Sequence, residues 1–158
     1  MFEYLRKMFS FNENPEEAGY REDRATDTKK KLQIATCTLF IQLAKADDNF
    51  TDQERDTIIS IMKSTYNLED ECIDELIKLA EKRLESDENI YDLTQLINQN
   101  LSNDDKFELL KSLWRLIYVN KKLDIYEDHL IKKIGGLINM GHEDIISAKL
   151  LVKEESGI

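Results

Sequence analysis

Two segments decide the fold: residues 47–54, Asp-Asp-Asn-Phe-Thr-Asp-Gln-Glu, and residues 120–127, Asn-Lys-Lys-Leu-Asp-Ile-Tyr-Glu. They lie 73 positions apart, and each follows an apolar run with helical spacing, residues 32–46 and residues 107–119. The same shift pairs further residues along the chain: Phe40 with Leu113, Leu43 with Leu116, Phe50 with Leu123, Glu54 with Glu127, Ile58 with Ile131 and Ile61 with Ile134. A helix–loop–helix unit that occurs twice predicts a domain with an internal pseudo-two-fold repeat.

Length and periodicity give the fold class. A chain of 158 residues is long enough for one domain with its own core. One proline and five glycines leave few breakers for long helices to avoid. Apolar residues recur at helical spacing, and no segment alternates with a period of two. The sequence therefore predicts an all-α fold, a single globular domain of about seven helices.

Two of the expected helices, residues 30–46 and 104–120, are apolar on most faces and occupy matched positions of the repeat. We expect them to be central and to pack against each other. Their largest apolar side chains should be buried, namely Phe40, Ile41, Leu113 and Trp114. The other helices are expected at about 52–66, 69–85, 90–99, 124–138 and 143–152.

The first 29 residues differ in character from the rest. Residues 1–11 are rich in apolar side chains with Arg6 and Lys7 between them, a pattern typical of a short amphipathic helix or of an arm that folds back on its own domain. Residues 12–29 are charged and have almost no large apolar residue, as in a tether. The expected organisation is an arm and tether over residues 1–29, a helical domain over 30–152 and a tail over 153–158.

Charge and cysteine content indicate the kind of partner and compartment. The chain has 32 acidic and 22 basic residues, a formal net charge of −10, which disfavours nucleic-acid binding and favours cations or a basic protein. Cys37 and Cys72 belong to no metal-binding motif, so they are expected to be free thiols in a reducing compartment. No apolar run of about 18 residues exists to span a bilayer. We expect a cytoplasmic protein with protein partners, whose only membrane contact would be through residues 1–11.

Residues 47–54, called loop one here, form a candidate cation site. Hard cations such as calcium or magnesium prefer several oxygen ligands, and a Glu at the start of the next helix can close such a site. The candidate ligands are Asp47, Asp48, Asp52 and Glu54. The spacing is not that of an EF-hand, because the loop is too short and has no glycine at its turn.

Helix capping explains part of the same pattern without a ligand. Thr51 and Glu54 have the spacing of a capping box, in which each side chain binds a backbone amide of the first helical turn. In residues 120–127, called loop two here, Asp124 and Glu127 have that spacing too. The loop-two counterparts of the candidate ligands, Asn120, Asp124 and Glu127, are therefore expected to be structural. Lys121 and Lys122 also neutralise that loop, so loop one is the expected site of any response to cations.

The same residues carry a resemblance to a known family. Residues 46–54 resemble the Ala-Asp-Gly-x-Ile/Leu-x-x-x-Glu signature of the TerB-like family, named from tellurite resistance, and residues 119–127 resemble a second copy. The resemblance covers roughly residues 30–152 and implies a duplicated all-α fold with a divalent-cation site. The signature glycine is Asp48 in loop one and Lys121 in loop two, where Asn120 also replaces the signature Asp. Within the resemblance, these departures favour loop one as the cation site.

The sequence offers little for catalysis. His129 and His142 lie in different segments, and neither a nucleophile elbow nor a glycine-rich phosphate loop is present. The resemblance implies a non-enzymatic interaction domain of a stress response. Two alternatives stay open: a metal-dependent enzyme built on loop one, and a free-standing adaptor related to the TerB-like module of DnaJ-type co-chaperones, without the His-Pro-Asp of their J-domain. No cofactor other than a divalent cation is expected.

Overall fold

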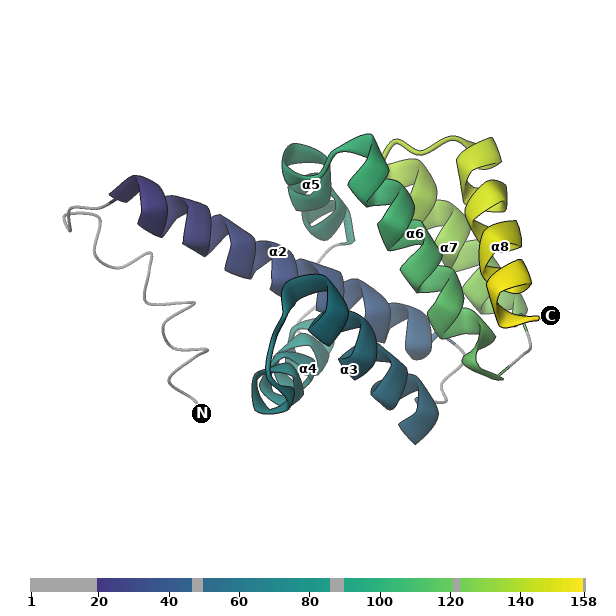
Figure 1. Cartoon of the computed structure of the whole chain (residues 1–158), viewed down its shortest axis with the longest axis horizontal. Coiled ribbons are helices and arrows are strands. Elements are labelled where there is room, and N and C mark those ends of the chain that lie inside the picture. Colours follow the sequence, from purple (N-terminus) through teal and green to yellow (C-terminus); the bar gives the residue numbers. More distant parts are fainter. Residues whose placement is uncertain (1–19, 47–49, 86–89, 121–122, 158) are drawn as a thin grey trace.

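The computed structural model describes residues 20–46, 50–85, 90–120 and 123–157. Every regular element in those ranges is a helix, as the sequence predicted (Figure 1). The elements are α2 (Tyr20–Ala44), α3 (Asp52–Tyr66), α4 (Asp70–Glu85), α5 (Ile90–Asn100), α6 (Asn103–Ile117), the short 3-10 helix η1 (Tyr118–Asn120), α7 (Ile125–Leu137) and α8 (His142–Ser156). None of the described helices is both long enough and apolar enough to cross a membrane.

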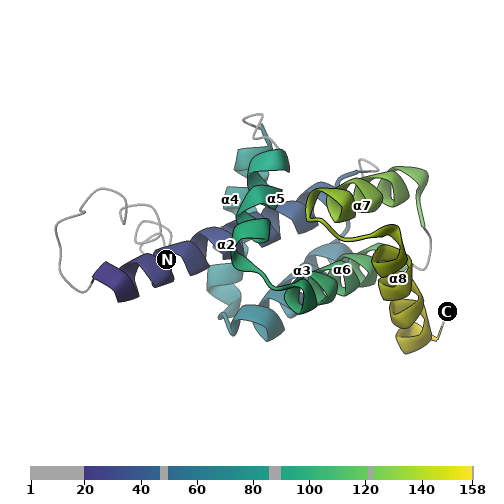
Figure 2. The same ribbon diagram turned by 90° about the horizontal axis from the view of Figure 1, so that it is seen from above.

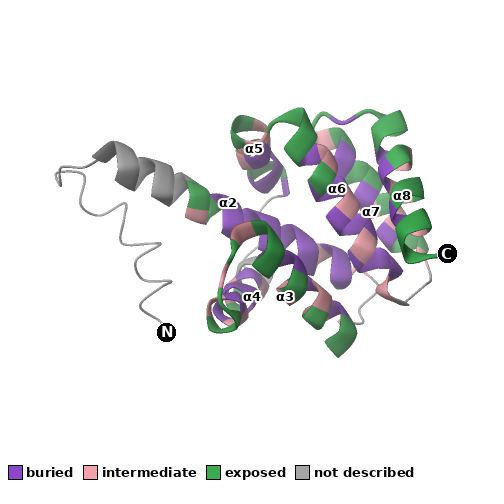
Figure 3. Cartoon of the chain, in the orientation of Figure 1, coloured by how far each residue is buried: buried purple, intermediate pink, exposed green. Residues whose placement is uncertain are grey.

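Helix α2 forms the centre of the domain. Every residue from Leu32 to Ile41 is buried, and α3, α4, α5, α6 and α7 all pack against this helix (Figure 3). A helix that is apolar on nearly every side has to be surrounded in this way. Phe40 and Ile41 of α2 and Leu113 and Trp114 of α6 are each at most 1 % exposed, which confirms the expected core.

The packing partners follow the order of the repeat. Helix α2 contacts α3 and α4, and its counterpart α6 contacts α7 and α8. The two halves also contact each other, because α2 packs on α7 and α3 packs on α6. Helix α5 lies between the two units in sequence and packs on α2 and α7. These contacts place the two units in one core, while an exact two-fold relation between them stays a prediction.

The first and last described helices extend beyond the bounds expected for them. Helix α2 begins at Tyr20 rather than near Lys30, and its first part projects beyond the other helices (Figure 2). Tyr20 and Ala25 are the only hydrophobic residues among 20–29, but this stretch includes good helix formers and neither proline nor glycine, so intrinsic propensity sustains the helix there. Helix α8 likewise continues past Val152 to Ser156 and ends at Gly157, which has the left-handed conformation (φ 70°) typical of a helix stop. The arm over residues 1–11 lies outside the described residues.

Candidate functional site

A groove of about 590 Å³ lies between α3 and α6, with α2 as its floor. Its buried lining combines apolar side chains with the hydroxyls of Thr36 and Ser112, whereas its exposed lining residues carry hydroxyl and carboxyl groups. The lining residues are Thr36, Phe40, Ser60, Ile61, Ser64, Thr65, Tyr66, Leu101, Asp105, Glu108, Leu109, Ser112 and Arg115. This volume lies within the range of small-molecule sites in proteins.

Two hydroxyl groups in the lining of the groove, those of Thr36 and Tyr66, are hydrogen-bonded to each other. Thr36 Oγ1 donates its single hydrogen to the backbone oxygen of Leu32 at 2.7 Å. The 2.9 Å bond between Thr36 Oγ1 and the Tyr66 hydroxyl must therefore have Tyr66 as its donor. Burial raises the pKa of Tyr66, and the hydrogen bond with Thr36 opposes part of that rise. The protonated tyrosine oxygen keeps its lone pairs available as hydrogen-bond acceptors.

The charged groups of the groove are unevenly paired. Arg115 pairs with Glu155 of α8, with Nε–Oε2 and Nη2–Oε1 distances of 2.9 and 3.3 Å, and this hydrogen bonding lowers the pKa of Glu155. Glu108 pairs with Lys111 of the same helix at 2.8 Å. Asp105 is exposed and has no ion-pair partner among the residues that the structure describes. The uncompensated charge of the groove is therefore negative.

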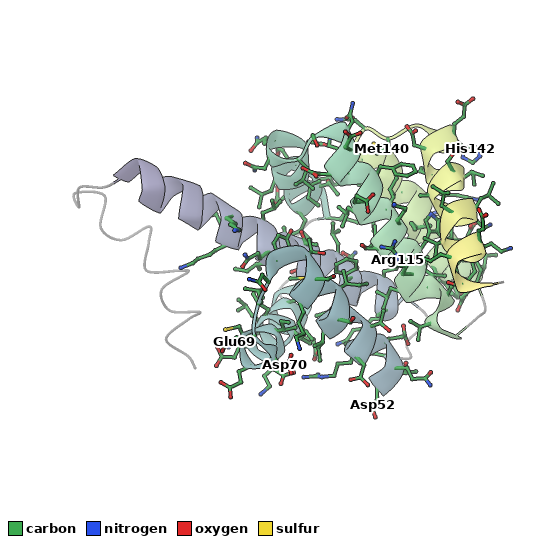
Figure 4. The ribbon with its side chains drawn as sticks, in the orientation of Figure 1. Asp52, Glu69, Asp70, Arg115, Met140 and His142 are labelled. Carbon is green, nitrogen blue, oxygen red and sulfur yellow. The ribbon has the colours of Figure 1, made fainter. Side chains whose placement is uncertain are left out.

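Loop one contains the capping box that the sequence indicated. Glu54 N donates to Thr51 Oγ1 at 3.1 Å, and the Thr51 backbone N–H donates to Glu54 Oε1 at 3.1 Å. Glu54 is only 2 % exposed, so its carboxylate is directed at the helix start rather than at solvent. Asp52 is exposed at the outer end of α3 (Figure 4). Asp47 and Asp48 lie outside the described residues, and the cation site that includes them stays a prediction.

Loop two has the same arrangement. Tyr126 N donates to Asp124 Oδ1 at 3.0 Å, and Asp124 N donates to Glu127 Oε1 at 3.4 Å. Glu127 is buried like Glu54. The side chain of Asn120 and residues 121–122 lie outside the described part of the chain. The two matched glutamates are thus structural at both helix starts.

The reactive side chains are dispersed. Burial raises the pKa of the Cys37 thiol to about 12, so this residue stays protonated and is not a nucleophile. His129 on α7 and His142 at the start of α8 are both exposed and belong to different helices. Within the described ranges, no three His, Cys, Asp or Glu side chains are grouped so that they could hold a metal ion.

The groove was not predicted from the sequence. One signal was present: Asp105, Glu108, Ser112 and Arg115 recur at spacings of three and four, which places them on one face of α6. A polar stripe of this kind is also typical of a plain solvated surface. Only the position of α3 beside it converts the stripe into the wall of a groove.

Comparison with known proteins gave one match. The model of the family described as "Tellurite resistance protein TerB" matches residues 33–150. The matched range begins in α2 and ends in α8, so it includes both capped loops and every residue that lines the groove. A search of curated proteins and a search of solved structures found no match.

Proposed function

Because the chain belongs to the TerB family, whose model matches most of its length, we propose that it is a non-enzymatic interaction domain of a stress response of the tellurite-resistance type. The observation that carries this proposal is the groove between α3 and α6. Its lining combines apolar surface with hydrogen-bonding groups, as protein-binding surfaces do. Its hydroxyls have no histidine among the lining residues to activate them.

The proposal includes the kind of partner and the location. We propose protein partners rather than nucleic acid, because a net charge of −10 repels phosphate backbones. We place the protein in the cytoplasm, with residues 1–11 as the segment that would contact a membrane surface. An adaptor of the co-chaperone type is one form of this function. A metal-dependent enzyme on loop one has less support, because the buried Glu54 carboxylate already binds the start of α3.

Site-specific cross-linking tests the interaction function. A photo-reactive side chain at Ser64, an exposed residue of the groove, is expected to give discrete protein adducts in cells that make the full chain. The same group at Lys78, which is exposed on α4 and does not line the groove, is the matched control. Equal adducts at both positions, or none at Ser64, would contradict an interaction site in the groove.

We further propose that loop one responds to a divalent cation. An ion would relieve the repulsion among Asp47, Asp48 and Asp52, whereas lysines already neutralise loop two. Calcium at ten times its dissociation constant would stabilise the fold by about 1.4 kcal/mol and raise the Tm by roughly 3–6 °C. Replacing both Asp47 and Asp48 by Asn is expected to abolish that rise in a thermal melt.

A matched control separates loop one from general acidity. Glu69→Gln with Glu71→Gln removes the same charge from the exposed start of α4. This variant should keep the calcium response of the wild type. An unchanged response in the Asp47/Asp48 variant, with loss in the Glu69/Glu71 variant, would locate the ion at the acidic start of α4. No response in the wild type would refute the cation proposal and leave the interaction function standing.

A further inference from the structure

The groove is long enough along α6 for a short helical segment. Its α6 wall runs from Asp105 to Arg115, about 15 Å at the rise of an α-helix, which matches roughly three helical turns of a bound segment. Phe40, Ile61 and Leu109 give it an apolar floor, and the exposed Ser60 and Ser64 leave its rim open to solvent. Apolar trenches between two helices are a recurrent way of binding the apolar face of an amphipathic helix.

The rim determines what charge that helix must have. The Tyr66 hydroxyl uses its hydrogen on Thr36, so it offers only lone pairs to the groove. The Asp105 carboxylate is an acceptor with no cationic partner within the described ranges, and it lines the same groove as Tyr66. Arg115 is already neutralised by Glu155. Among the charged groups of the groove, the one without an opposite charge is therefore a carboxylate acceptor, which favours a cationic donor.

We infer that the groove binds a basic amphipathic helix of a partner protein, with apolar residues on the floor and a Lys or Arg reaching Asp105 and Tyr66. This inference rests on the proposed interaction function and specifies its ligand. The net charge of −10 adds long-range attraction for such a partner and accelerates its encounter with the groove. Of the charged groups that line the groove, Asp105 contributes most to the choice of partner.

The probe is a synthetic helical peptide of about 18 residues with leucines on one face and lysines on the other. Its binding to the full chain is measured by fluorescence anisotropy at about 0.15 M salt, where distant charges are screened. Asp105→Lys is expected to weaken binding about ten-fold or more, since it replaces an attractive pair with a repulsive one. Tyr66→Phe should weaken it by about three-fold through loss of one acceptor. A peptide with Glu in place of Lys should not bind.

Asp104→Lys is the matched control. Asp104 lies in the same exposed first turn of α6 but does not line the groove, so both variants change the net charge and the helix terminus alike. Thermal melts of both variants check that the fold is retained. Equal losses of affinity for Asp104→Lys and Asp105→Lys would show general attraction to an acidic surface and overturn the inference.

Two further outcomes distinguish a different occupant of the groove from a different ligand chemistry. The segment over residues 1–11 also combines apolar residues with Arg6 and Lys7. If Arg6→Glu with Lys7→Glu raises the affinity for the probe about ten-fold, the chain's own segment is the occupant and the partner inference is overturned. If the Leu/Lys peptide does not bind while Ser64 still forms protein adducts, the interaction function survives and its ligand is not a basic helix.

Discussion

Replacing Trp114 by alanine is expected to lower the free energy of unfolding by about 3–5 kcal/mol, the usual range for removing a buried tryptophan. The side chain is fully buried in α6, and its Nε1 donates to the backbone oxygen of Ile145 in α8 at 3.0 Å. Its ring stacks on Tyr118 with centroids 5.9 Å apart, and Lys149 Nζ lies 5.4 Å from its centre. The substitution therefore leaves a cavity and removes a bond between two helices.

Chemical denaturation of the full chain measures this loss of stability. The variant Trp114→Phe separates the contribution of the hydrogen bond from that of the packing. Phenylalanine keeps most of the apolar volume but has no donor for the backbone oxygen of Ile145. Loss of that hydrogen bond should lower the free energy of unfolding by about 0.5–1.5 kcal/mol. The alanine variant should be clearly the less stable of the two. A free energy of unfolding within about 1 kcal/mol of wild type for Trp114→Ala would contradict the packing of α6 against α8.

Two adjacent glycines of α7 are expected to respond to alanine with opposite signs. A Cβ on Gly135 would lie 2.7 Å from Cγ1 of Ile145, a residue that is itself buried, so crowding of about 1–3 kcal/mol should exceed the helix-propensity gain. A Cβ on the exposed Gly136 would meet no atom within 4 Å. Gly136→Ala should therefore stabilise the protein by about 0.5–1 kcal/mol.

The same pair provides its own control, because the two substitutions have the same chemistry one position apart in one helix. Thermal and urea unfolding of both variants compares them directly. Stabilisation by both alanines would mean that α7 and α8 are further apart at Gly135 than the structure places them. The Cδ1 methyl of Ile145 would lie nearer still to the added Cβ than Cγ1 does. Replacing Ile145 by Val removes Cδ1 and keeps Cγ1, so it should reduce the penalty of Gly135→Ala in the double variant.

Much of the helical architecture could be predicted from the sequence because its signals are local. The apolar spacing around Phe40 and Trp114 marks two central helices, and both are buried as expected. The pairs Thr51–Glu54 and Asp124–Glu127 mark two helix starts, and both capping boxes are present. The first ten residues of α2 were missed because apolar content was the criterion, whereas a helix needs only favourable propensity to continue.

The groove could not be predicted in the same way because its parts are distant in sequence. Ser64 and Asp105 face one space only after α3 packs on α6. The bond that orients the Tyr66 hydroxyl joins residues 30 positions apart, and the pair that neutralises Arg115 joins residues 40 positions apart. The periodicity of a helix relates only residues a few positions apart, so it predicts neither of these pairs. The polar stripe of α6 also resembles any solvated helix face. Tertiary packing alone distinguishes a binding wall from a surface.

The central position of α2 also has a consequence for biosynthesis. Its last residue, Ala44, is made about 90 residues before Leu137 completes α7, a helix that packs against it. At roughly 5–20 residues per second, a ribosome needs about 5–20 s to supply that helix. During this interval part of the apolar surface of α2 lies open to neighbouring nascent chains. The yield of folded protein therefore depends on translation speed and chaperone supply as well as on the stability of the finished domain.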